Sequence, residues 1–203
     1  NVKPGSWYHT HECFGPVLGI MRADTLEEAI KLQNSTGFGL TGGIHSLDQD
    51  EIDYWRENVE VGNAYVNRGI TGAIVERQSF GGWKDSAIGS GAKAGGPNYV
   101  AQQGVWADGD LSQVPSVSLD PAINRALRDI LSTVELSDED REWLQKAAHL
   151  DALAWREEFN VEHDRTALLC ETNVFRYRPL LQPLQVRIGD DFKLRDVLRL
   201  QLA

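Results

Sequence analysis

A glycine-rich stretch from residue 67 to residue 97 constrains this chain of 203 residues more than any other feature. Glycine destabilises the interior of a helix or a strand, so a stretch this rich in it is not built for regular structure. The glycines are Gly69, Gly72, Gly81, Gly82, Gly89, Gly91, Gly95 and Gly96. They allow positive φ angles or a close approach of the backbone to a bound group. The stretch is therefore predicted to be a shaped loop.

A short strand-like run, Asn63-Ala-Tyr-Val-Asn67, leads directly into this loop. A glycine-rich loop at the end of a buried strand is a common place for the binding site of an α/β enzyme. A flexible linker and a packed loop without a ligand are the two other interpretations. The linker is disfavoured because the stretch carries apolar side chains such as Ile70, Phe80 and Trp83.

The residues before the loop alternate between predicted strands and predicted helices. The apolar run over residues 12–21 has the length of a strand, and residues 40–45 and 64–66 are predicted as two more. Thr25 and Glu28 form a capping box for a first helix. A second helix is predicted over residues 48–60, with Ile52, Trp55 and Val59 on one face. This order predicts an α/β fold with parallel strands joined by crossover helices.

The composition changes after residue 107, where small and polar residues predominate. Residues 108–119 are therefore predicted to be a linker, and residues 120–203 a smaller mixed α/β domain. Asp120-Pro121 and Ser137 are predicted to begin two helices there. Residues 171–179 and 184–188 are predicted as strands, and residues 192–202 as an amphipathic helix.

The composition excludes several classes of function. The net charge of −10 disfavours binding to nucleic acid or to an anionic membrane, and no apolar run is long enough to span a bilayer. Two distant cysteines, Cys13 and Cys170, favour a reducing cytoplasm without disulfides, and each is predicted to be a small buried hydrophobe. His9 and His11 are interpreted as a surface pair rather than a metal site, because no third ligand stands nearby.

The run Phe80-Gly81-Gly82, followed by a serine and further glycines up to Gly91, resembles the C-terminal end of an aldehyde dehydrogenase. Two further runs indicate a narrower group within this family: Thr71-Gly72-Ala73 and Lys93-Ala-Gly-Gly-Pro97. They are similar to the L-glutamate γ-semialdehyde (1-pyrroline-5-carboxylate) dehydrogenases, including the dehydrogenase half of bifunctional proline-utilising enzymes. The resemblance implies that residues 1–97 are the C-terminal part of an aldehyde dehydrogenase catalytic domain with NAD as its cofactor.

The resemblance also implies roles for particular residues. Glu12, in the run Glu-x-Phe-Gly-Pro, would bind the ribose beside the nicotinamide, and Phe14 would pack at the nicotinamide end. Thr71, Gly72 and Ala73 would bind the α-carboxylate of the substrate, because a glycine followed by a small residue can present successive N–H groups to an anion. Phe80 would form an aromatic wall against the aliphatic part of the substrate.

No residue of this chain matches the nucleophile of the family, a cysteine in a Gly-Gln-x-Cys setting. We expect that cysteine upstream, and the chain to be a piece of a longer protein that is inactive alone. Residues 98–107 resemble the strand through which the family forms oligomers, so a homo-oligomer is expected. The alternatives are an aldehyde dehydrogenase for another aldehyde, or a non-catalytic assembly module.

Overall fold

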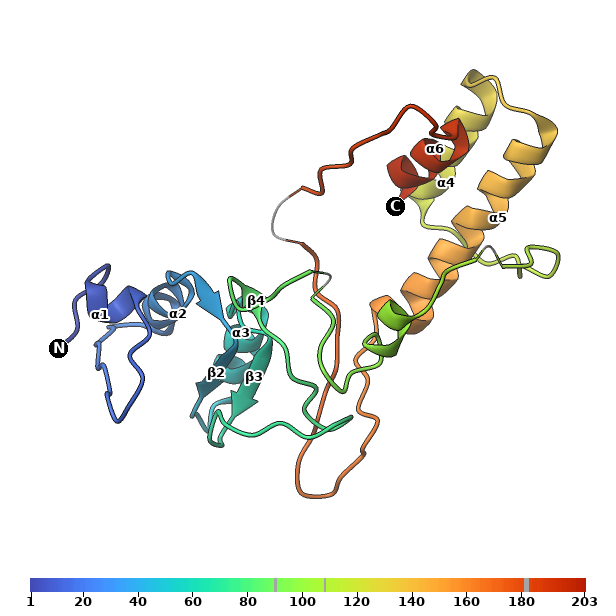
Figure 1. Ribbon diagram of the computed structural model, residues 1–203. Helices are drawn as coiled ribbons and strands as arrows, with labels where there is room; N and C mark the ends of the chain where they lie inside the picture. Colours follow the sequence, from blue (N-terminus) through green and yellow to red (C-terminus); the bar gives the residue numbers. More distant parts are fainter. Residues whose placement is uncertain (90, 108, 181–182) are drawn as a thin grey trace. The chain divides into compact units, whose positions relative to one another are not determined.

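The computed structural model describes residues 1–89, 91–107, 109–180 and 183–203. Residues 90, 108, 181 and 182 belong to the predicted glycine-rich loop, the predicted linker and the predicted tail, and they lie outside the described residues. The chain divides into two compact units, Asn1–Val105 and Trp106–Ala203. In Figure 1 the first unit runs from blue to green and the second from green to red.

The first unit is a mixed α/β structure with two small sheets among its described residues. Its elements are α1 (Trp7–Thr10), α2 (Leu26–Asn34), β1 (Phe38–Gly39), β2 (Thr41–Ile44), α3 (Gln49–Asn58), β3 (Asn63–Val66), β4 (Trp83–Lys84) and the 3₁₀-helix η1 (Val100–Gln103). Strands β2 and β3 pair in parallel, with α3 between them in the sequence, and β1 pairs antiparallel with β4. The glycine-rich loop begins directly after β3, at residue 67.

The helices α2 and α3 begin at the residues that the sequence predicts. Thr25 Oγ1 accepts a hydrogen bond from Glu28 N at 3.2 Å, whereas the Glu28 carboxylate accepts from Asp24 N at 2.8 Å. The Glu28 carboxylate thus binds the N–H group of the residue before the N-cap, and not that of the N-cap Thr25 as in a regular capping box. Asp48 caps α3 by accepting from Asp50 N at 2.9 Å and from Glu51 N at 3.4 Å.

The core of the first unit lies between α2, α3 and the start of β3. Ile30, Trp55, Val59 and Val61 are buried against one another, and Ile52 is buried on the same helix. Trp55 Nε1 also donates to Gln33 Oε1 at 2.9 Å, which joins α3 to α2. The predicted apolar face of residues 48–60 is confirmed.

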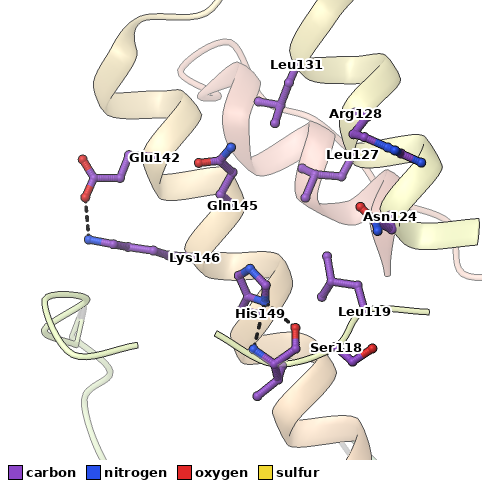
Figure 2. Close-up of a pocket in the computed structure, with 11 residues that line it drawn as sticks. Ser118, Leu119, Asn124, Leu127, Arg128, Leu131, Glu142, Gln145, Lys146 and His149 are labelled. Atoms are coloured by element: carbon purple, nitrogen blue, oxygen red, sulfur yellow. Dashed lines mark hydrogen bonds and ion pairs between the residues drawn. The ribbon is translucent and has the colours of Figure 1, made fainter. Parts of the chain in front are cut away.

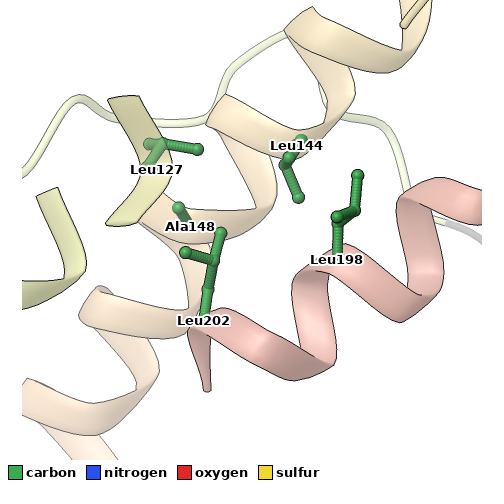
Figure 3. Packing of buried hydrophobic residues seen from close by; sticks show 5 residues of the cluster. All are labelled: Leu127, Leu144, Ala148, Leu198 and Leu202. Carbon is green, nitrogen blue, oxygen red and sulfur yellow. The ribbon is translucent and has the colours of Figure 1, made fainter. Parts of the chain in front are cut away.

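The second unit is built on helices. They are α4 (Pro121–Thr133), α5 (Asp138–Ala154), the π-helix η2 (Trp155–Phe159) and α6 (Leu194–Leu202). The predicted starts are confirmed, since Asp120 accepts from Ala122 N at 2.7 Å and Ser137 Oγ from Asp140 N at 3.1 Å. Figure 3 shows its core, where Leu127 of α4, Leu144 and Ala148 of α5, and Leu198 and Leu202 of α6 meet.

Several predicted strands are wrong. No strand is assigned to residues 12–21, where Leu18 and Ile20 remain exposed, although Val2 N donates to Ile20 O at 2.8 Å. Residues 171–179 form a single bridge, Phe175 with His163, and the described part of 184–188 contains no strand. A strand needs a neighbouring strand along its whole length, and residues 171–179 have only this bridge. The segment instead packs through its aromatic side chains, with the ring centroids of Tyr177 and Phe159 4.8 Å apart.

The segment 98–107 also differs from its predicted extended form. The 3₁₀-helix η1 occupies Val100–Gln103, and Val100 and Val105 are exposed. An isolated edge strand has no ladder of backbone hydrogen bonds, and a 3₁₀ turn satisfies part of the backbone locally.

Candidate functional site

The loop after β3 is held at its first turn by a buried tyrosine. Tyr65, on β3, donates its hydroxyl proton to Gly72 O at 2.9 Å. Gly72 has a φ of 91°, and a Cβ added there would meet nothing within 4 Å. Glycine is therefore required at residue 72 by the backbone angle and not by crowding.

Two segments of the glycine-rich loop lie antiparallel to each other. Phe80 N donates to Ala94 O at 3.0 Å, and Ala94 N donates back to Phe80 O at 2.9 Å. Glu76 N and Ser79 Oγ both donate to Gly95 O, at 3.0 and 3.2 Å. The two segments form a small ribbon, so the loop has a defined shape instead of the freedom of a linker.

The carboxamide of Asn63 holds the backbone on both sides of Phe80. Asn63 is a buried polar residue at the start of β3. Its Nδ2 donates to Ser79 O at 3.0 Å, and its Oδ1 accepts from Gly81 N at 3.1 Å. Together with the two bonds to Ala94, these contacts fix the position from which the Phe80 side chain leaves the backbone.

Lys93 binds three oxygen atoms beneath the loop. Its Nζ donates to Gly62 O, to Gly81 O at 2.8 Å and to Asn63 Oδ1 at 3.3 Å. Burial lowers the pKa of Lys93 from 10.5 to about 8, so the ammonium form still predominates at neutral pH. The three oxygen acceptors favour that charged form, because an ammonium has three N–H groups to donate.

The predicted substrate-binding residues lie at the surface of this loop. Thr71, Gly72 and Ala73 are exposed, and Phe80 is 37% exposed. Within the described residues, the N–H groups of Gly72 and Ala73 donate no hydrogen bond to another protein group. Two exposed N–H groups next to a positive φ angle are suited to binding a small anion such as a carboxylate.

The predicted cofactor-binding residues lie elsewhere in the first unit. Glu12 and Phe14 are on the segment between α1 and α2, and Phe14 is 93% exposed. In Figure 1 this blue segment is separated from the loop that follows β3. Glu12 and Phe14 therefore lie on a different segment of the first unit from residues 71–80.

The two cysteines differ in their exposure to solvent. Cys13 is half-buried, as a small apolar residue can be, whereas Cys170 is exposed. The prediction that Cys170 is buried is wrong, because its loop folds around Asp164 instead of an apolar core. The Asp164 carboxylate accepts from the N–H groups of Thr166, Ala167 and Asn173. These hydrogen bonds lower the pKa of Asp164.

Sequence reasoning missed the residues that shape the loop: Asn63, Tyr65 and Lys93. The available signals were a polar residue opening an apolar strand and a single lysine inside a run of small residues. Neither signal indicates which distant backbone atoms the side chain binds.

A cavity of about 560 Å³ lies in the second unit, between α4 and α5. Figure 2 shows two interactions among the residues that line it: Lys146 pairs with Glu142 at 2.6 Å, and His149 Nδ1 lies 2.9 Å from Val117 O. The cavity contains none of the residues predicted to act in binding or catalysis.

Residues 1–89, 91–107, 109–180 and 183–203 lack two further kinds of feature. No helix among them is long and apolar enough to cross a membrane. No group of three or more His, Cys, Asp or Glu residues in the same ranges could hold a metal ion. His9 instead accepts a hydrogen bond from Gly5 N at 2.9 Å, and His11 stacks on Trp7.

Comparison with known proteins identifies the family. Residues 1–103, which are half of the chain and include the whole glycine-rich loop, match the model of the Aldehyde dehydrogenase family. The chain belongs to the aldehyde dehydrogenase family. The resemblance to this family seen in Phe80-Gly81-Gly82 and the residues around it is confirmed.

Several similar proteins belong to a narrower group within this family. The 1-pyrroline-5-carboxylate dehydrogenases of Bacillus thuringiensis (strain Al Hakam) and Bacillus mycoides (strain KBAB4) are each 48% identical to this aldehyde dehydrogenase chain over 90 residues. The matched residues are 44% of this chain and 17% of each relative. The structure of proline utilization A (PutA) from Corynebacterium freiburgense is 60% identical, with a TM-score of 0.82, over 100% of this chain and 19% of that one. The chain thus spans less than one fifth of the length of these relatives.

Proposed function

We propose that this chain is part of an NAD-dependent aldehyde dehydrogenase that oxidises L-glutamate γ-semialdehyde to L-glutamate in proline catabolism. The observation that carries the proposal is the loop after β3, where the exposed N–H groups of Gly72 and Ala73 stand on the same loop as Phe80. The names of the Bacillus and Corynebacterium relatives support the same substrate.

The loop is suited to two parts of this substrate, its α-carboxylate and its methylene groups. The N–H groups of Gly72 and Ala73 bind the α-carboxylate, with Thr71 beside them, and Phe80 packs on the methylene groups between the carboxylate and the aldehyde. A backbone site of this kind holds an anion without a large positive charge. Substrates lacking the carboxylate leave these N–H groups without their partner, which disfavours them.

The residues before α2 are suited to the cofactor. The Glu12 side chain is exposed, so its carboxylate can accept hydrogen bonds from the two hydroxyl groups of a ribose, and the exposed Phe14 ring offers an apolar face to a nicotinamide. NAD, when bound, accepts the hydride that leaves the aldehyde carbon. Glu12 orients the sugar and so the ring. The cysteine nucleophile belongs to a part of the protein outside this chain.

The assembly segment, residues 98–107, is proposed to join a second copy of the protein. Val100, Val105 and Trp106 are 75%, 100% and 81% exposed, and apolar side chains this exposed are suited to an interface. Residues 1–97 would then belong to the catalytic domain. Residues 108–119 would be a linker and residues 120–203 a separate C-terminal domain.

Steady-state kinetics of the full-length protein tests the function. We expect kcat/KM for glutamate semialdehyde to exceed that for pentanal, an uncharged aldehyde with the same number of carbon atoms, by at least about tenfold. Ala73→Pro, which removes one of the two N–H groups at a residue whose φ angle is not positive, should lower this preference. Equal kcat/KM values for the two aldehydes in the wild-type protein would rule out glutamate semialdehyde as the specific substrate.

A further inference from the structure

We infer that Lys93 is a positioning residue for Phe80, and so a determinant of how tightly the protein binds aldehydes with an extended chain. The inference rests on the proposed function, since it assigns a residue to the same loop. The Lys93 side chain is half-buried, and it acts on the substrate only through the backbone that carries Phe80.

The Lys93 ammonium joins two segments that are far apart in sequence. Gly62 O stands where β3 begins, and Gly81 O belongs to the residue after Phe80. A Cβ added to Gly81 would lie 3.1 Å from Lys93 Cγ, so the stem of the lysine lies directly against this glycine. The charged end and the apolar stem therefore both contact the backbone that follows Phe80.

The Phe80 backbone has little freedom as long as this arrangement is intact. Its own N–H and C=O groups pair with Ala94, the residue next to Lys93. The neighbouring Ser79 O and Gly81 N bind the Asn63 carboxamide, whose oxygen lies 3.3 Å from Lys93 Nζ. Loss of the ammonium leaves the Gly62 and Gly81 carbonyls without this donor in a partly buried place, which favours a shift of the backbone.

A second lysine provides a matched control. Lys84 Nζ also donates to backbone carbonyls, Asn34 O at 2.5 Å and Thr36 O at 3.2 Å, and it pairs with Glu60 at 2.6 Å. These contacts hold the end of α2 and the residues before β1, and none of them involves the Phe80 backbone. Lys84→Met therefore removes the same chemical group from a similar setting without releasing Phe80.

The experiment compares Lys93→Met, Lys93→Arg and Lys84→Met in the full-length protein. The substrates are glutamate semialdehyde and acetaldehyde, whose single methyl group leaves no chain for Phe80 to contact. For Lys93→Met we expect KM for the semialdehyde to rise roughly tenfold, the value of one hydrogen bond from a charged group. We expect its kcat, and kcat/KM for acetaldehyde, to stay within about twofold of wild type. Lys93→Arg should recover part of the KM, and Lys84→Met should change neither substrate.

A double-mutant cycle with Phe80→Ala tests whether Lys93 acts through Phe80. Lys93→Met should raise KM for the semialdehyde much less in the Phe80→Ala background than in the wild-type background. If Lys93→Met does not accumulate as folded protein, Lys93→Gln, which keeps an N–H donor without the charge, gives the same comparison.

Three results would overturn the inference. They are an equal loss of kcat/KM for both aldehydes, an additive effect in the cycle, and an unchanged KM in Lys93→Met. All three leave the proposed function standing as long as the wild-type protein prefers glutamate semialdehyde to pentanal. A wild-type protein without that preference contradicts the proposed function itself.

Discussion

Among single residues, Tyr65 offers the simplest test of how the loop is held. Its ring is buried and its hydroxyl binds Gly72 O, so Tyr65→Phe removes one hydrogen bond and keeps the packing. A neutral hydrogen bond contributes about 1 kcal/mol, which corresponds to a rise of roughly fivefold in KM for glutamate semialdehyde. The exposed Tyr54→Phe is the control, and equal KM values for both variants would show that the bond to Gly72 does not shape the substrate site.

Lys93 also gives the loop a dependence on pH. Because burial lowers the pKa of Lys93 from 10.5 to about 8, this side chain is charged below that pH and loses its third N–H donor above it. The ratio of KM for glutamate semialdehyde between wild type and Lys93→Met should therefore be lowest below pH 8 and approach one as the pH rises. The comparison of two proteins at each pH cancels the titration of the substrate. A ratio that does not change with pH would contradict this titration.

The candidate site could be predicted from the sequence only where its chemistry is local. Thr71, Gly72 and Ala73 are assigned to the substrate by the family resemblance, and the glycine beside small residues that could present N–H groups is visible in the sequence itself. Lys93 and Asn63 are different, because each acts on atoms 12 to 31 residues away in the sequence. A lysine inside a run of small residues looks the same in the sequence whether it is solvated or buried.

At the scale of elements, the contact between β3 and the loop depends on Gly62. A Cβ added to Gly62 would lie 1.9 Å from Gly81 O and 2.7 Å from Gly82 Cα, both of which are backbone atoms. Gly62→Ala should therefore separate the loop from β3 and destabilise the first unit by about 1–3 kcal/mol or more. Gly69→Ala is the matched control, because nothing lies within 4 Å of its added Cβ.

The measurement is thermal unfolding together with KM for glutamate semialdehyde in the full-length protein. Gly62→Ala should lower the melting temperature and raise KM, whereas Gly69→Ala should stay close to wild type. If both variants behave alike, the close approach of Gly62 to the loop is not what holds the two elements together.

Helix starts and strands also differ in whether nearby or distant residues determine them. The starts of α2, α3, α4 and α5 were predicted because a capping side chain binds N–H groups two or three residues away. The strands predicted over residues 12–21 and 171–179 were wrong because an apolar or alternating pattern does not supply the partner that a strand requires. Strands β2 and β3 do have partners, because they pair with each other in parallel and α3 connects them.

At the scale of the whole molecule, the proposed roles fall on two separate segments of the first unit. Glu12 and Phe14 lie between α1 and α2, and the substrate residues lie after β3. The chain spans 17% of its Bacillus relatives, and under the proposed function the rest of the site belongs to parts of the protein outside this chain.

Self-association through the assembly segment follows from the same reasoning about exposed apolar surface. Val105 is 100% exposed at the end of the first unit, and a glutamate there would place an unpaired charge in an apolar interface. We expect Val105→Glu to lower the mass of the full-length protein in sedimentation experiments from that of an oligomer toward that of a single chain. Val186→Glu is the control, because Val186 is also exposed but lies outside residues 98–107. An unchanged mass for Val105→Glu, or an equal loss of mass for both variants, would mean that residues 98–107 do not form the interface. If the prediction holds, the exposed valines of this segment are explained by a second copy of the protein, and the 3₁₀ turn η1 describes the segment before it is paired.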